Sequence, residues 1–185
     1  MIGWLASIWF KLNGWKTTGR FPEEVPKMVI AVGPHTSGWD VVVGLGARHL
    51  FPIKHSFFLG KKELFDGPFG WFFRAIGGTP VDRSSSHGMV QQVADKFKQH
   101  EYFRLAMSPE GTRKKVDKLR TGFYFIAKEA QVPILLAGLD FTKKEVIIGD
   151  LIYPSNEADD FKKIISFFAG VEGKHPELGL KHLDI

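Results

Sequence analysis

Short apolar segments alternate with segments of helical periodicity along most of this chain, and this alternation is its strongest constraint on fold. Apolar runs such as 28–32 and 134–139 are typical of strands whose two faces are both covered. Segments such as 39–50 and 122–130 instead repeat apolar residues at helical spacing. The repeated order of strand, loop and helix predicts an α/β domain with a central, mostly parallel to mixed sheet flanked by helices.

The remaining elements follow from the same rules. The 185 residues are expected to form a single domain, 1–185, with residues 28–140 as its core. The chain has no cysteine, which excludes disulfides and a thiol nucleophile. We predict strands over 28–32, 56–59, 79–81, 102–107, 134–139 and 145–148, the last two joined by a turn at 142–144, and helices over 39–50, 69–76, 89–97, 122–130 and 159–169.

Residues 1–16 predict an amphipathic helix. The first apolar run ends at Lys11, whereas a membrane span takes about 20 residues, and a signal peptide would need a basic start. Tryptophan beside lysine is typical of a helix that lies in the lipid interface, although packing on the chain's own domain explains the same pattern. One side of the predicted helix carries Trp4, Leu5, Ile8, Trp9, Leu12 and Trp15.

The charge balance favours anionic partners. The chain carries 25 lysine and arginine residues against 20 acidic residues, for a formal net charge of +5. Phosphorylated ligands, anionic membranes and nucleic acid all satisfy this balance. Because the sequence has neither a stacking-aromatic motif nor a recognition-helix pattern, we do not expect nucleic-acid binding.

The segment 34–40 follows a predicted buried strand and opens a predicted helix. It contains His35 and Asp40. Histidine is the usual general base near neutral pH, and a carboxylate that fixes its tautomer improves it in that role. A helical first turn folds the chain back, so these two side chains can approach each other.

The same segment has a purely structural explanation. Ser37 followed by Asp40 is typical of a helix capping box, which needs no catalytic function. A capping box does not account for His35. The start of the helix also offers backbone N–H groups, at Gly38 and Trp39, that could hold an oxyanion.

Further polar segments follow three other predicted strands. Lysines in 60–64, including Lys61, could contact a phosphate as point charges. The segment 77–83 places two glycines before an extended run that ends in Arg83, a residue type suited to bidentate phosphate binding. The segment 108–113 is a polar loop that continues into a basic run. Each of these alone is equally typical of a solvated surface.

Several catalytic motifs are absent from the sequence. It contains no Gly-x-Ser-x-Gly elbow, no Ser-x-x-Lys, no His-Glu-x-x-His and no Walker A loop. With neither a serine elbow nor a cysteine, acyl chemistry in this chain is expected to proceed by direct transfer with a histidine base. No metal site and no cofactor are expected.

The order and spacing of these segments resemble the glycerolipid acyltransferase family, whose best-known members are the lysophosphatidic acid acyltransferases. The resemblance covers about residues 28–140. Its blocks are His-x4-Asp at 35–40, Lys-x-Glu-Leu at 61–64, the run ending in Asp-Arg at 78–83, Pro-Glu-Gly-Thr-Arg at 109–113, Arg-Thr-Gly at 120–122 and Val-Pro-Ile at 132–134. The sequence departs from the family at Ser108, where an aromatic or aliphatic residue is usual, and in the run 135–137, which lacks the second proline common in the family's fourth block.

The resemblance implies roles for these residues. His35 would be the general base and Asp40 its orienting partner, with the donor an acyl-CoA or an acyl carrier protein. The acceptor would be a lysophospholipid with a glycerol phosphate group, and another lyso-lipid, such as a lyso-ornithine lipid, is an alternative. The predicted acceptor site comprises Lys61, Arg83, Glu110, Gly111, Thr112 and Arg113.

The expected location is the cytoplasmic face of a membrane, with peripheral or monotopic attachment. A different class of function uses the same basic loops without His35: a catalytically idle phospholipid binder at the membrane surface. Acyl transfer would depend on His35, whereas lipid binding by such a protein would not, so the two hypotheses are separable.

Overall fold

A computed structural model describes residues 2–51, 56–81 and 86–183 of the protein. Within these ranges, seven strands form one sheet in the order β1-β7-β6-β2-β5-β3-β4. All neighbouring strands are parallel except β6 and β7, which are antiparallel. The strands are β1 (Lys16–Thr18), β2 (Lys27–Gly33), β3 (Ser56–Lys61), β4 (Gly78–Val81), β5 (Phe103–Met107), β6 (Ile134–Asp140) and β7 (Glu145–Ile152).

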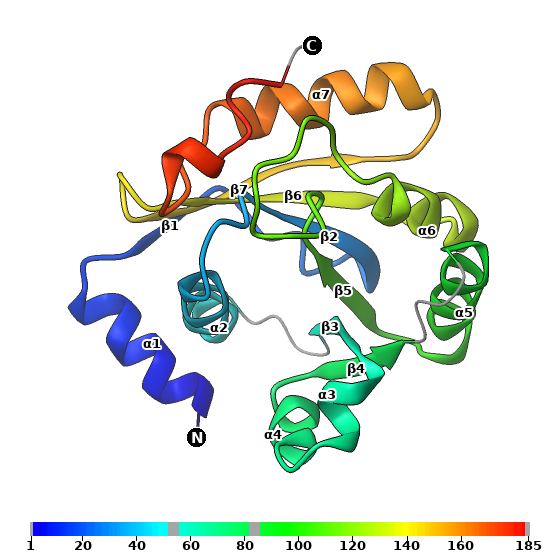
Figure 1. Ribbon diagram of the computed structural model, residues 1–185, viewed down its shortest axis with the longest axis horizontal. Coiled ribbons are helices and arrows are strands. Elements are labelled where there is room, and N and C mark those ends of the chain that lie inside the picture. The colour runs from blue at the N-terminus through cyan, green and yellow to red at the C-terminus, as the bar shows by residue number, and fades with distance from the viewer. Residues whose placement is uncertain (1, 52–55, 82–85, 184–185) are drawn as a thin grey trace.

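Helices cover the sheet. Figure 1 shows α7 on one side of the sheet and α1 and α2 on the other. The described helices are α1 (Ile2–Leu12), α2 (Trp39–Leu50), α3 (Lys62–Asp66), α4 (Gly70–Ala75), α5 (Ser86–Gln99), α6 (Gly122–Ala130), α7 (Glu157–Ala169) and the 3-10 helix η1 (Pro176–Leu178). The predicted α/β class, with its largely parallel sheet flanked by helices and its N-terminal helix, is confirmed.

The two faces of the sheet bury separate clusters. Alternate residues of a strand point to opposite faces. In β2, Val29 and Ala31 pack in the cluster that includes α6 and α7, whereas Met28 and Ile30 pack with Phe21 on the opposite face. Every residue of β6 is buried. The apolar runs without alternation therefore belong to strands covered on both faces, as the sequence predicts.

The sheet brings two polar loops to one edge. Strands β2 and β5 are parallel neighbours, with Ala31 opposite Met107. The carboxyl ends of parallel strands meet at the same edge of a sheet, where ligands of α/β folds commonly bind. The segment 34–38 leaves β2 there, and the segment beginning at Ser108 leaves β5 there.

The N-terminal helix is shorter than predicted. It ends at Leu12, and Lys16 already begins strand β1, which the sequence reasoning missed. The physical reason is the turn at 13–14: the Asn13 amide donates to the Trp9 carbonyl at 2.9 Å, and Gly14 has a φ of 75°, which ends the helix. Trp15 lies beyond the helix and is buried, in contact with the ring of Phe141.

Helix α1 packs on α2 and also exposes apolar side chains. Phe10 is fully buried, and a side chain at Gly46 of α2 would lie only 2.9 Å from the Phe10 Cβ, so the two helices are in close contact. Trp4 and Leu5 are each 56% exposed, and Leu12 is 81% exposed. No helix within the described residues has both the length and the hydropathy needed to cross a bilayer.

Candidate active site

His35 and Asp40 form a hydrogen-bonded pair at the carboxyl end of β2. The His35 Nδ1 lies 2.8 Å from the Asp40 Oδ2. The Asp40 side chain is 4% exposed, whereas that of His35 is 28% exposed, so the carboxylate is buried and the imidazole reaches the surface. Because Nδ1 faces the carboxylate, Nε2 is the nitrogen left to exchange a proton with a ligand.

The same carboxylate oxygen also fixes the start of α2. The Ser37 backbone N–H donates to the Asp40 Oδ2 at 2.9 Å, which is one half of the capping-box pattern. One oxygen atom therefore bonds both to the start of the helix and to His35, so the capping function does not exclude a chemical one. The other oxygen, Asp40 Oδ1, is buried and has no hydrogen-bond partner among the described residues.

Glu110 lies behind His35. Its side chain is almost fully buried, with 1% of its surface exposed. Its Oε1 accepts a 2.6 Å hydrogen bond from the His35 backbone N–H. Its Oε2 accepts one of 2.8 Å from the Ser108 hydroxyl. Burial raises the pKa of Glu110, and these two donors oppose that rise.

Ser108 shapes the loop that carries Glu110. Its Oγ accepts from the backbone N–H of Glu110 at 3.2 Å and from that of Gly111 at 3.3 Å, while its hydroxyl donates to the Glu110 carboxylate. An aromatic or aliphatic side chain here could make none of these bonds. The departure from the family pattern at position 108 thus coincides with a local hydrogen-bonding network around the buried carboxylate.

Arg113 lies beside the start of α2. A Cβ on Gly38 would be 3.4 Å from the Arg113 Nη1. The Arg113 side chain is exposed, and no described carboxylate is within ion-pair distance of it. Gly111 has a φ of 66°, which turns the loop in the left-handed region. The Thr112 Oγ1 accepts from the Lys114 N–H at 3.3 Å within the loop.

The two predicted oxyanion donors differ. The Trp39 N–H donates to the Ser37 Oγ at 3.2 Å and is therefore already engaged. Among the described residues, no acceptor is hydrogen-bonded to the Gly38 N–H. Gly38 is thus the better placed of the two for an oxyanion.

Two predicted phosphate-binding residues lie partly or wholly outside the described structure. Lys61 is the last residue of β3, which neighbours β5, and only its backbone is described. Arg83 lies outside the described residues. The structure therefore brings His35, Asp40, Gly38, Trp39, Glu110 and Arg113 together at one sheet edge.

Three neighbours of this site were not predicted from the sequence. The Trp9 ring of α1 stacks on Trp39, with centroids 5.5 Å apart and planes 19° apart. The His175 N–H donates to the Thr36 Oγ1 at 3.2 Å, and the Lys174 ammonium lies 4.7 Å from the centroid of the Trp39 ring. These residues belong to no motif, and only the tertiary fold brings them to segment 34–40.

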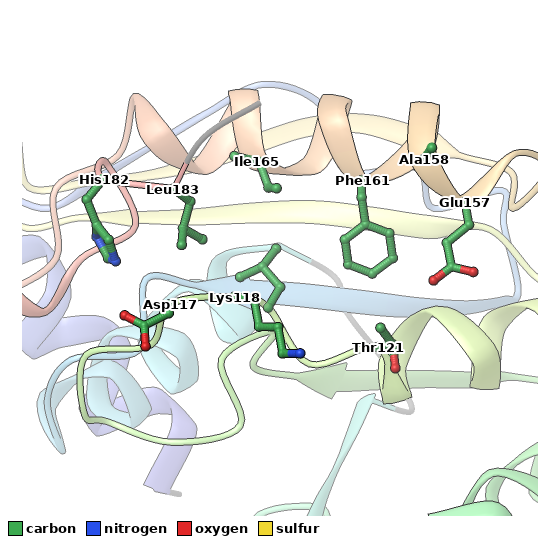
Figure 2. Close-up of a pocket in the computed structure, with 10 residues that line it drawn as sticks. Asp117, Lys118, Thr121, Glu157, Ala158, Phe161, Ile165, His182 and Leu183 are labelled. Atoms are coloured by element: carbon green, nitrogen blue, oxygen red, sulfur yellow. The ribbon is translucent and has the colours of Figure 1, made fainter.

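A separate cavity lies between α7 and the loop that leads to α6. It has a volume of about 610 Å³, and Figure 2 shows Phe161 and Ile165 of α7 pointing toward the loop that carries Lys118 and Thr121. Neither His35 nor Asp40 lines it. Within the described residues, no group of three or more histidine, aspartate or glutamate side chains could hold a metal ion.

Comparison with known protein families gives a match over most of the chain. A family model described as Acyltransferase matches residues 16–137. The chain belongs to this acyltransferase family. The match includes the segments of His35, Glu110 and Arg113, and it ends before Lys174.

The chain is also similar in sequence to a named acyltransferase. The 1-acyl-sn-glycerol-3-phosphate acyltransferase of Streptococcus pneumoniae (strain ATCC BAA-255 / R6) is 30% identical over 138 residues, which cover 72% of this chain and 50% of the relative. The aligned part of the chain spans about half the length of that relative.

Proposed function

We propose that this protein transfers a fatty acyl group from an acyl thioester to the hydroxyl of a glycerol phosphate lyso-lipid, in phospholipid biosynthesis. The observation that carries the proposal is the His35–Asp40 pair, 2.8 Å apart, with the imidazole at the surface of a parallel-strand edge. Membership of the acyltransferase family and the similarity to a 1-acyl-sn-glycerol-3-phosphate acyltransferase support this substrate class.

His35 acts as the general base. Its Nε2 removes the proton from the acceptor hydroxyl as the oxygen attacks the thioester carbonyl carbon. The Gly38 N–H donates to the oxyanion of the tetrahedral intermediate. When the C–S bond breaks, the thiolate leaves and takes the proton from the imidazolium. Asp40 holds Nδ1 protonated throughout, so that Nε2 is the atom that accepts the proton.

The basic residues around the site bind the acceptor. Arg113 extends from the Glu110 loop to the start of α2, where an arginine can bind a phosphate with two parallel hydrogen bonds. Lys61 and Arg83 contribute further charge in this proposal, and Gly111 and Thr112 shape the loop. Glu110, being buried, positions His35 instead of touching the acceptor.

The membrane surface supplies the acceptor. Trp4, Leu5 and Leu12 of α1 are exposed, and Lys11 lies at the end of the same helix. Tryptophan and lysine on an exposed apolar helix face favour the lipid interface. We propose that α1 lies between the bilayer and α2, with the protein on the cytoplasmic face of the membrane.

Acyl transfer to a panel of lyso-lipids tests the proposal. Purified protein is given acyl-CoA or acyl carrier protein as donor, with lysophosphatidate, other lysophospholipids and lyso-ornithine lipid as acceptors, and products are read by mass spectrometry. Lysophosphatidate should be the preferred acceptor. Preference for lyso-ornithine lipid would change the acceptor, and liposome binding without any transfer would support an idle phospholipid binder.

The His35→Ala variant tests the mechanism in the same assay. A general base contributes about 10²–10⁴-fold, so turnover should fall by at least about 100-fold. His49→Ala provides the matched control, because His49 is an exposed histidine in the last turn of α2. Near-normal transfer by a folded His35→Ala protein would contradict the mechanism.

A further inference from the structure

Lys174 lies beside the proposed active site. Its ammonium is 4.7 Å from the centroid of the Trp39 ring. Trp39 immediately precedes Asp40 in the sequence. No described carboxylate is within ion-pair distance of this ammonium. A cation over an indole ring keeps its full charge and remains able to bind an anion.

The backbone holds Lys174 in this place. The His175 N–H donates to the Thr36 Oγ1 at 3.2 Å, on the segment that carries His35. A Cβ on Gly173 would lie 2.7 Å from the same Thr36 oxygen, so the Thr36 side chain packs directly against the Gly173 backbone. On the other side, the Glu172 carbonyl accepts from the Phe141 N–H at 2.8 Å. The segment 172–175 is therefore fixed between the end of β6 and the turn of His35.

Arg113 supplies a second cation at the same point of the fold. It comes from the loop after β5 and lies against Gly38, whereas Lys174 follows α7 and lies against Trp39. Gly38 and Trp39 are consecutive residues, so both cations lie against the first turn of α2, beside the proposed general base. No described carboxylate pairs with either cation, so both are available to an anionic group that binds at the start of α2.

We propose that Lys174, together with Arg113, binds a phosphate group of a substrate. This inference rests on the proposed function for its substrate class. The phosphate has two possible sources: the glycerol phosphate of the acceptor, or the phosphates of the acyl donor. Lys174 lies outside the family match at 16–137, so no motif assigns it this role.

Direct binding distinguishes the sources. Isothermal titrations use a short-chain lysophosphatidate and its phosphate-free monoacylglycerol as one pair of probes, and coenzyme A and phosphate-free pantetheine as the other. They are carried out on the full chain, on Lys174→Met, which keeps the apolar stem over Trp39, and on Lys174→Arg. Lys163→Met is the matched control, because Lys163 is an exposed lysine of α7 with no described carboxylate within ion-pair distance.

Loss of a charge-assisted hydrogen bond should raise the Kd of one phosphorylated probe by about 10-fold or more in Lys174→Met. The affected probe identifies the source, and Lys174→Arg should restore most of the affinity. The inference is overturned if both phosphorylated probes bind Lys174→Met as they bind the wild type, if the phosphate-free probes weaken equally, or if the wild type binds neither phosphorylated probe.

Transfer assays on the same preparations separate this inference from the proposed function. Transfer by the wild type, combined with unchanged phosphate binding in Lys174→Met, overturns only the role of Lys174. Phosphate binding that depends on Lys174, without acyl transfer by the wild type to any acceptor, supports the binding site and overturns the proposed enzyme.

Discussion

The carboxylate of Glu110 accepts a 2.6 Å hydrogen bond from the backbone N–H of His35, although 75 residues separate them in sequence. The bond joins the loop after β5 to the loop after β2, at the edge where the two parallel strands end. This hydrogen bond joins Glu110 to the main chain of the proposed base, so we expect Glu110 to affect catalysis through the position of His35.

Replacing Glu110 should lower turnover more than acceptor binding. In Glu110→Ala the His35 N–H loses its acceptor and the segment 34–40 shifts, so kcat should fall by about 10-fold or more while the acceptor KM changes little. Steady-state kinetics with lysophosphatidate measure both. Glu129→Ala, at an exposed position of α6, should leave both unchanged. A rise in KM at constant kcat would instead place Glu110 in the acceptor site.

The pH dependence of stability should carry a contribution from Glu110. Burial raises its pKa above the ordinary value of 4.5, so between these two pKa values the folded state binds more protons than the unfolded state. The stabilising contribution of this group is then largest below the unfolded pKa and decreases as pH rises through the folded pKa. Because glutamine does not titrate, the Glu110→Gln variant lacks this pH-dependent contribution.

Chemical denaturation of wild type and Glu110→Gln measures this contribution. The free energy of unfolding of the wild type, relative to that of Glu110→Gln, should decrease as pH rises above the ordinary carboxyl pKa of 4.5. A difference that increases over this range would mean that the hydrogen bonds from His35 and Ser108 outweigh burial and lower the pKa.

Two glycines of α2 should respond oppositely to alanine. A Cβ at Gly46 would lie 2.9 Å from the Phe10 Cβ and 3.0 Å from the Ala6 carbonyl oxygen, so Gly46→Ala must displace α1. A Cβ at Gly44 meets nothing within 4 Å. We expect Gly46→Ala to lower the free energy of unfolding by about 1–3 kcal/mol, and Gly44→Ala to raise it by up to about 1 kcal/mol.

Near-ultraviolet circular dichroism adds a second measurement on these variants. The Trp9–Trp39 stack depends on the position of α1, so its signal should change in Gly46→Ala and persist in Gly44→Ala. Equal stability and equal spectra for the two variants would show that α1 does not pack on α2 as described.

The Tyr124 hydroxyl should stabilise the contact of α6 with the start of α7. It donates to the buried Asp160 Oδ2 at 2.9 Å, and that oxygen also accepts from the Ser155 N–H at 2.8 Å. Burial, followed by the hydrogen bond to Asp160, raises the pKa of Tyr124 to about 12. In Tyr124→Phe the carboxylate keeps one of these two donors, so the free energy of unfolding should fall by about 1–3 kcal/mol.

The matched control is Tyr153→Phe, because Tyr153 is 65% exposed. Its effect should stay within about 0.5 kcal/mol, as is usual for surface substitutions. If thermal or urea unfolding gives equal losses for the two variants, the buried hydrogen bond contributes nothing measurable.

The sequence by itself determined most of the elements, though not β1 or α3, and the order of the polar segments. Apolar runs such as 134–139 identify strands because a strand covered on both faces has no polar side, and helical spacing identified Trp39–Leu50 with its observed bounds. The pairing of His35 with Asp40 was also predictable from local sequence. His35 lies just before the helix and Asp40 in its first turn, where the chain folds back on itself.

Only the tertiary structure decided what surrounds that pair. Parallel pairing of β2 with β5 brings Glu110 under the backbone of His35, and burial makes its carboxylate a support and not a surface group. The approach of segment 172–175 to Thr36 places Lys174 over Trp39. Such contacts depend on strand order and on close backbone packing between segments distant in sequence, which local periodicity does not encode.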